Sequence, residues 1–109
     1  NLDKTQLIRI VTNLIKNAMQ ASEKEEKPSI EVQVISEGRN IKILVSDNGK
    51  GIPEDVKDLI FEPKFTTKSS GMGLGLPMIK NIVEAYDGAI SFTSKFGVGT
   101  VFTVILPTE

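Results

Sequence analysis

Apolar residues recur every three or four positions between residue 3 and about residue 24. This period places them along one side of an α-helix, with the apolar arc centred near Val11 and Ala18. The positions that carry the period are Leu7, Val11, Leu14, Ile15, Ala18 and Ala21. Asp3, followed three residues later by Gln6, predicts a capping box at the start of this helix.

Beyond this helix, two pairs of segments alternate apolar and polar residues, which is typical of β-strands. Glu37-Gly38-Arg39-Asn40 separates the first pair and Gly97-Val98-Gly99 the second, so each pair is predicted to form a hairpin. Asp87-Gly88 predicts the end of a second long helix. The elements predicted after the first helix are strands at 30–35 and 41–45, a short helix at 53–60, a loop at 62–72, a helix at 76–86, and strands at 89–94 and 100–106.

This order of elements predicts one α+β domain over residues 1–109. We expect a two-layer α/β sandwich, in which a mixed, mostly antiparallel sheet carries its helices on one face. A chain of 109 residues, with 39% hydrophobic and 25% charged, is long enough to hold a single core. Its start at Asn1, without a Met, indicates a piece of a longer protein.

The residue types that are missing exclude several kinds of chemistry. With no Cys and no His, the chain has no disulfide, zinc ribbon, cysteine nucleophile or Ser-His-Asp triad. Its 13 Lys and Arg against 14 Asp and Glu give a formal net charge of −1, so no nucleic-acid partner is expected. Because no apolar run reaches about eighteen residues, we expect a cytoplasmic domain without direct membrane contact.

Asn13, Asn17 and Gln20 form a polar stripe at one edge of the apolar arc of the first helix. Such a stripe is common on a solvated helix flank, and that interpretation stays open. The other interpretation is a metal site, because an Asn side-chain oxygen is a neutral ligand suited to Mg²⁺. This ion takes the rest of its shell from water and phosphate oxygens.

Asp47-Asn48-Gly49-Lys50-Gly51 directly follows a predicted strand. Its Asn-Gly pair is a hairpin signal, but a helix start follows here instead of a returning strand. The alternative to a turn is a site for a flat ring. The carboxylate of Asp47 can accept a hydrogen bond from an amino group, and glycines let a ring approach the backbone closely.

Gly71-Met72-Gly73-Leu74-Gly75 leads into the helix predicted from Leu76. Alternating glycines free backbone amides and a helix N-terminus adds partial positive charge, so this segment is suited to hold phosphates. Neither the Rossmann fingerprint nor the P-loop fits, because no strand precedes the glycines and the Gly-Lys-Ser/Thr ending is missing. A flexible linker is the other interpretation.

Phe61 precedes the predicted loop and Phe65 lies within it, and both are interpreted as anchors of this loop in the core. Lys68 lies between these anchors and the glycines. Its side chain is therefore able to reach a bound anionic group, although an ordinary surface lysine is an equally open interpretation.

Together, the four patterns closely resemble the motifs of one family. In order and spacing, they match the N box, the two glycine boxes and the F box of sensor histidine kinase catalytic domains, in the GHKL or Bergerat-fold superfamily of ATP-binding domains. The matching patterns are Asn13-x-x-x-Asn17, Asp47-x-Gly49-x-Gly51, Phe61-x-x-x-Phe65 and Gly71-x-Gly73-x-Gly75. The resemblance covers essentially the whole chain, and residues 13–21 with 62–68 are most similar to the nitrogen-regulation branch.

The resemblance implies a site for ATP and Mg²⁺. Asn17 would coordinate the Mg²⁺ that bridges the phosphates, and Asp47 would accept the adenine amino group with help from Thr100. Residues 62–72 would form a mobile lid. The full set of implied nucleotide-binding residues is Asn13, Asn17, Gln20, Ala21, Asp47, Gly49, Gly51, Ile52, Phe65, Lys68, Gly71, Met72, Gly73, Leu74, Gly75, Leu76 and Thr100. Many relatives carry Lys or Arg where this chain has Gln20, which places more charge neutralisation on Mg²⁺ and Lys68.

The resemblance also separates a kinase from a hydrolase. Superfamily members that hydrolyse ATP carry a Glu at the position of Asn13, whose amide cannot accept a proton as a general base. The implied reaction is transfer of the γ-phosphoryl group to a His on a separate dimerisation and phosphoacceptor domain, because this chain has no His. A response regulator is the expected downstream partner. An inner-membrane anchor elsewhere in the parent protein is compatible with this assignment.

Two alternatives stay open. One is a GHKL hydrolase or a serine-directed anti-sigma kinase, which Asn13 disfavours. The other is a degenerate GHKL regulatory module that binds nucleotide without transfer activity, which Gln20 favours.

Overall fold

The computed structural model describes residues 3–61 and 76–107. Its elements are α1 (Lys4–Ser22), β1 (Ile30–Glu37), β2 (Asn40–Asp47), the 3-10 helix η1 (Glu54–Leu59), α2 (Leu76–Ala85), β3 (Ala89–Lys95) and β4 (Gly99–Pro107). Each predicted helix and strand is confirmed, with strands slightly longer than predicted. The loop predicted at 62–72 lies outside the described residues.

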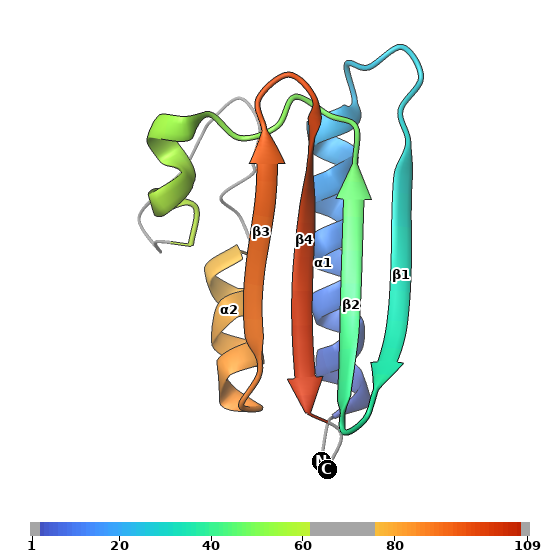
Figure 1. The fold of residues 1–109 in the computed structure, drawn as a ribbon, viewed down its shortest axis with the longest axis vertical. Coiled ribbons are helices and arrows are strands. Elements are labelled where there is room, and N and C mark those ends of the chain that lie inside the picture. The colour runs from blue at the N-terminus through green and yellow to red at the C-terminus, as the bar shows by residue number, and fades with distance from the viewer. Residues whose placement is uncertain (1–2, 62–75, 108–109) are drawn as a thin grey trace.

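The four strands form one sheet in the order β1-β2-β4-β3, and each pairing is antiparallel. Both α-helices lie on one face of this sheet (Figure 1), where α1 contacts β2 and α2 contacts β3. An antiparallel sheet is able to leave its other face to solvent. The predicted α+β two-layer sandwich is therefore confirmed.

The hydrophobic core lies between the sheet and the helices. Every second residue of β2 and β4 points into it, as the alternation of buried and less buried positions shows. The buried core residues are Ile10, Leu14, Ala18, Ala21, Ile43, Val45, Ile52, Ile60, Leu76, Ile79, Val83, Phe102, Val104 and Leu106.

The buried side of α1 differs from the predicted arc. Val11 is only partly buried, whereas Ile10 and Asn17 are 0% and 4% exposed. Because α1 contacts both β2 and α2, more of its circumference is enclosed than a single apolar stripe implies. The buried arc is therefore shifted from Val11 toward Ile10 and Asn17, while Ala18 is buried as predicted.

The start of α1 has half of the predicted capping box. The Asp3 carboxylate accepts a hydrogen bond from the Thr5 backbone N–H at 2.9 Å, as an N-cap residue does. The return bond from Gln6 is not formed, since Gln6 Oε1 is buried and finds no partner in the described part of the chain. The cap is confirmed and the box is wrong.

Helix α2 ends at the predicted Asp87-Gly88 pair, but Asp87 and not the glycine takes the left-handed conformation that ends it. The φ of Asp87 is 62°. The Gly88 N–H bonds the Val83 carbonyl at 2.9 Å, which completes a Schellman motif. Gly88 is required for a different reason, because a Cβ there would lie 2.4 Å from the Ile105 carbonyl oxygen.

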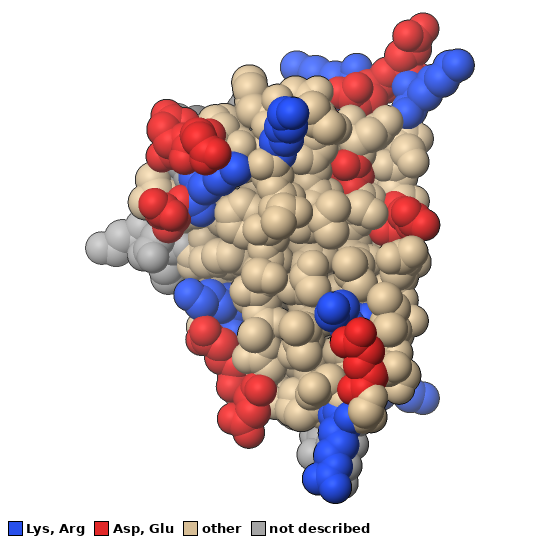
Figure 2. Space-filling view, in the orientation of Figure 1, with Lys and Arg blue, Asp and Glu red and all other residues tan. Residues whose placement is uncertain are grey.

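The face of the sheet that turns away from the helices has few charges. Figure 2 shows Lys, Arg, Asp and Glu mainly around its rim, with uncharged residues in the middle. Two ion pairs on described residues lie at the periphery, Lys42–Glu37 at 3.8 Å and Lys57–Glu54 at 3.0 Å. Within residues 3–61 and 76–107, no helix is long and apolar enough to cross a membrane.

Candidate functional site

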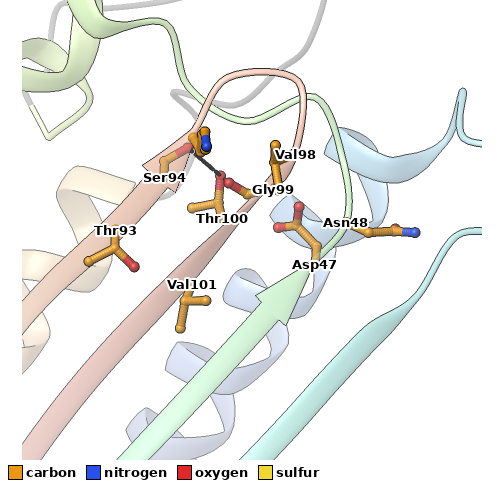
Figure 3. Close-up of a pocket in the computed structure, with 9 residues that line it drawn as sticks. Asp47, Asn48, Thr93, Ser94, Val98, Gly99, Thr100 and Val101 are labelled. Atoms are coloured by element: carbon orange, nitrogen blue, oxygen red, sulfur yellow. Dashed lines mark hydrogen bonds between the residues drawn. The ribbon is translucent and has the colours of Figure 1, made fainter.

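Three polar side chains form a row across the ends of three strands. Asp47 of β2 lies opposite Thr100 of β4, and Thr100 lies opposite Ser94 of β3. Opposite residues of neighbouring strands point to the same face of a sheet. Thr100 alternates with the buried Phe102 and Val104, so this face is the one that the helices cover. The row therefore lies at one end of the apolar core. Figure 3 shows the side chains of Asp47, Thr100 and Ser94 at the strand ends.

The Ser94 hydroxyl joins this row to the loop that follows β2. Its oxygen lies 2.8 Å from Thr100 Oγ1, and it accepts a hydrogen bond from the Ile52 N–H at 2.7 Å. It also lies within donor distance of the Gly99 carbonyl oxygen, at 3.2 Å. Nothing in the sequence patterns singled out Ser94. A small polar residue at a buried position of an alternating strand was the available signal.

Burial raises the pKa of the Asp47 carboxyl above its ordinary value of 3.8, because the charged form loses hydration. Backbone hydrogen bonds from Gly49 and Thr100 act in the opposite direction and offset part of this effect. The Gly49 N–H lies 2.8 Å from Asp47 Oδ1. Asp47 is therefore a fixed hydrogen-bond acceptor whose charge is costly at this buried position.

The loop after Asp47 is held between α1 and the β3–β4 turn. The Lys50 N–H donates to the Ala21 carbonyl at 3.2 Å, and the Gly97 N–H donates to the Lys50 carbonyl at 2.6 Å. A Cβ on Gly49 would lie 2.3 Å from the Ala21 carbonyl oxygen, so only glycine fits. The hairpin-turn interpretation of this segment is wrong, because the chain continues into η1.

Asn48 fastens the same loop to the segment before β1. Its Oδ1 accepts from the Ser29 N–H at 2.8 Å, and its Nδ2 donates to the Lys27 carbonyl at 2.9 Å. Asn48 therefore has a structural role that sequence reasoning did not assign.

The three amides predicted on α1 have different surroundings. Asn17 is buried, and its Nδ2 has no hydrogen-bond partner among the residues that the structure describes. Asn13 is half-buried and its Nδ2 donates to the Arg9 carbonyl at 2.8 Å. Gln20 is exposed. The solvated-flank interpretation therefore holds for Gln20 and is wrong for Asn17.

Most of the predicted site residues that are described lie at the same end of the domain. Ala21 contacts Gly49, Ile52 bonds Ser94, and Asn17 lies one turn before Ala21 on the enclosed side of α1. Leu76 is buried in the same core at the start of α2. The predicted residues outside the described part are Phe65, Lys68, Gly71, Met72, Gly73, Leu74 and Gly75.

A shallow pocket of about 360 Å³ borders Asp47 and Thr100. Its described lining comes from the ends of β2, β3 and β4 and the adjoining turns. It includes Thr93 and Val101, which alternate with the core-facing residues and point to the uncovered face. The pocket therefore shares Asp47 and Thr100 with the predicted nucleotide site, whereas Asn17, Ala21 and Leu76 are not part of its described lining.

The backbone at Gly51 is constrained both by its conformation and by a close contact with β3. It has φ of +75°, and a Cβ there would lie 2.4 Å from the Lys95 carbonyl oxygen. Gly38 has a similar φ of +60°, with nothing within 4 Å. Urea unfolding should show that Gly38→Ala costs about 1 kcal/mol of strain and Gly51→Ala about 1–3 kcal/mol more. Equal losses would contradict the close contact.

The raised pKa of Asp47 predicts a pH-dependent stability. The folded state holds this proton more tightly than the unfolded chain, so the stabilisation by the neutral carboxyl is complete below pH 3.8. It is lost as pH rises through the folded-state pKa. Relative to Asp47→Asn, the wild-type free energy of unfolding should therefore fall across this range and then stay level. Urea unfolding of both proteins at several pH values measures this difference in the free energy of unfolding. A difference that rises with pH would contradict the burial effect.

Comparison with known proteins identifies the family. The model for "Histidine kinase-, DNA gyrase B-, and HSP90-like ATPase" matches residues 2–109. The sensor histidine kinase ZraS of Escherichia coli (strain K12) is 44% identical over 105 residues, covering 96% of this chain and 22% of ZraS. A probable C4-dicarboxylate sensor kinase of Halalkalibacterium halodurans is 41% identical over 104 residues, covering 93% and 20%. The chain thus spans about a fifth of the length of these curated relatives.

Solved structures agree with this family. The catalytic domain of histidine kinase ThkA, in a nucleotide-free form, has a TM-score of 0.84 at 30% identity, covering 97% of this chain and 69% of that one. The mycobacterial sensor histidine kinase MprB gives 0.79 at 26% identity, covering 97% and 74%. The chain therefore belongs to the family of histidine kinase-, DNA gyrase B- and HSP90-like ATPases, as a catalytic domain of the sensor histidine kinase type.

Proposed function

We propose that this chain binds Mg²⁺-ATP and transfers the γ-phosphoryl group to a His on a separate dimerisation and phosphoacceptor domain of the same protein. Residues 1–109 are the single ATP-binding domain of this longer kinase, which serves a response regulator. The observation that carries the proposal is the row of Asp47 and Thr100 on the helix side, at the same end of the domain as the buried amide of Asn17. The finer assignment to the nitrogen-regulation branch stays a prediction, because the relatives above carry other names.

The base would be read by Asp47. Its ionised carboxylate can only accept hydrogen bonds, and the Gly49 N–H fixes one of its oxygens at 2.8 Å. An exocyclic amino group of adenine matches such an acceptor. Ile52 and Leu76, at 1% and 0% exposure, would form the apolar side of the base site. Gly49 and Gly51 have no side chains, so the backbone of this loop would be open to a flat ring.

Asn17 is the residue that we propose as the Mg²⁺ ligand. The Nδ2 of this buried amide is a hydrogen-bond donor without a partner among the described residues, which fits an acceptor such as a phosphate oxygen beside it. Among residues 3–61 and 76–107, no three His, Cys, Asp or Glu side chains gather to hold a metal. One amide oxygen suits Mg²⁺ that is otherwise held by water and phosphate, where the ion neutralises phosphate charge.

Transfer to a separate His agrees with the residues around this site. Asn13 is not a base and its Nδ2 is bonded to the Arg9 carbonyl, so it does not activate water. Phosphoryl transfer depends mainly on positioning and charge stabilisation, which the domain can supply while the nucleophile comes from elsewhere. The alternative is a degenerate GHKL module, which the exposed, uncharged Gln20 favours.

Calorimetric titration with an unhydrolysable ATP analogue tests the nucleotide site. We expect wild-type binding that strengthens with Mg²⁺, and a loss of about tenfold to a hundredfold in Asp47→Ala, because a hydrogen bond to a charged acceptor is removed. Asn17→Ala should keep Mg²⁺-independent binding and lose the strengthening by Mg²⁺.

The matched control is Asp55→Ala, which removes an exposed carboxylate from η1 and should bind like wild type. Melting curves of all variants separate a binding defect from unfolding. A folded wild-type chain that binds no analogue would contradict the proposal.

A transfer assay tests the reaction. With ATP, Mg²⁺ and the His-bearing helical domain of the parent protein, the chain should label that His, and Asn17→Ala should reduce the rate at least about tenfold, since the proposed metal ligand is lost. Without the helical domain, no appreciable ATP hydrolysis is expected. Rapid hydrolysis by the isolated chain would indicate the hydrolase alternative. Binding without labelling would indicate the degenerate module.

A further inference from the structure

The half-buried Ser94 hydroxyl lies where three elements meet. It contacts the loop after β2 through the Ile52 N–H at 2.7 Å, and β4 through the Gly99 carbonyl at 3.2 Å and Thr100 Oγ1 at 2.8 Å. The Lys57 ammonium group of η1 donates to the Ser94 backbone carbonyl at 2.8 Å. Side chain and backbone of Ser94 are therefore both fixed from outside β3.

The number of hydroxyl protons limits how the hydrogen bonds around Ser94 Oγ can be arranged. The Ile52 N–H can only donate, so it occupies one lone pair of Ser94 Oγ. Ser94 has one proton for two acceptors, the Gly99 carbonyl and Thr100 Oγ1. If Ser94 donates to Gly99, then Thr100 donates to Ser94 and both hydroxyl protons are used. If Ser94 donates to Thr100, the Thr100 proton needs another acceptor.

The burial of Thr100 favours the first arrangement. Its side chain is 2% exposed, and Ser94 Oγ is the partner found for its hydroxyl in the described part of the chain. Buried hydroxyl groups without a partner are costly. Thr100 therefore gives its proton to Ser94 and has only lone pairs left for a further partner.

We propose that Ser94 is a positioning residue for base selectivity, which keeps Thr100 a hydrogen-bond acceptor beside the Asp47 carboxylate. Asp47 and Thr100 are directly opposite each other on β2 and β4, so the site presents two adjacent acceptors (Figure 3). Two acceptors match the two hydrogens of a 6-amino purine and repel the oxygen of a 6-oxo purine. This inference rests on the proposed function.

The test compares ADP with IDP, which carries an oxygen in place of the 6-amino group. Calorimetry on the full chain should show that wild type prefers ADP. Ser94→Ala frees the Thr100 proton for donation and should lower the ADP/IDP affinity ratio about five- to tenfold, the effect of one neutral hydrogen bond. Ser94→Thr retains the hydroxyl and should retain the ratio. Ser91→Ala, an exposed serine on the same strand, is the matched control and should leave the ratio unchanged.

A double-mutant cycle shows whether Ser94 acts through Thr100. Thr100→Val should lower the ratio as Ser94→Ala does, and adding Ser94→Ala to Thr100→Val should change it no further. Additive losses, parallel weakening of ADP and IDP, or an unchanged ratio in Ser94→Ala would overturn the positioning role. If Ser94→Ala does not fold, an unchanged ratio in Thr100→Val overturns it. A folded wild-type chain that binds neither nucleotide contradicts the proposed function instead.

Discussion

The site depends on a carboxylate that is held at the end of an apolar core. Asp47 loses hydration there, and two backbone N–H groups, from Gly49 and Thr100, offset only part of that loss. Both donors belong to segments whose positions are fixed by other contacts, the loop on α1 and the start of β4. A positive or hydrogen-bond-donating partner would offset the rest of this loss. The purine amino group that we propose as this partner would supply such a donor.

The sandwich is thin, which explains why its backbone segments approach so closely. The loop after β2 passes between α1 and the β3–β4 turn, and backbone hydrogen bonds join it directly to both. Glycines at 49 and 51 permit these approaches, and the Cβ of any other residue would overlap a carbonyl oxygen. The glycine spacing that marks the family is thus a packing requirement as well as a means of access for a ligand.

Periodicity and turn residues were enough to predict the helices, the strands and the one-sided packing, because each of these follows from local spacing. Asp47 was predicted as an acceptor from its position after a strand, whereas Thr100 was assigned through the resemblance. Their placement opposite each other depends on strand register. Burial of Asn17 could not be predicted, since it results from α1 contacting both β2 and α2. The role of Ser94 could not be predicted for a similar reason. A serine acquires its role from neighbours that are distant in sequence, here Ile52 at 2.7 Å.

The bond from the Lys50 N–H to the Ala21 carbonyl joins the loop after β2 to the last turn of α1. The last carbonyls of a helix lack partners within the helix, and here one of them is satisfied by the loop that carries Gly49 and Gly51. The loop is therefore part of the C-terminal cap of α1, so opening the loop also frays the last helical turn. The end of α1 and the loop after β2 therefore form one cooperative unit of local unfolding. Their amide hydrogens would exchange with solvent in a single opening event.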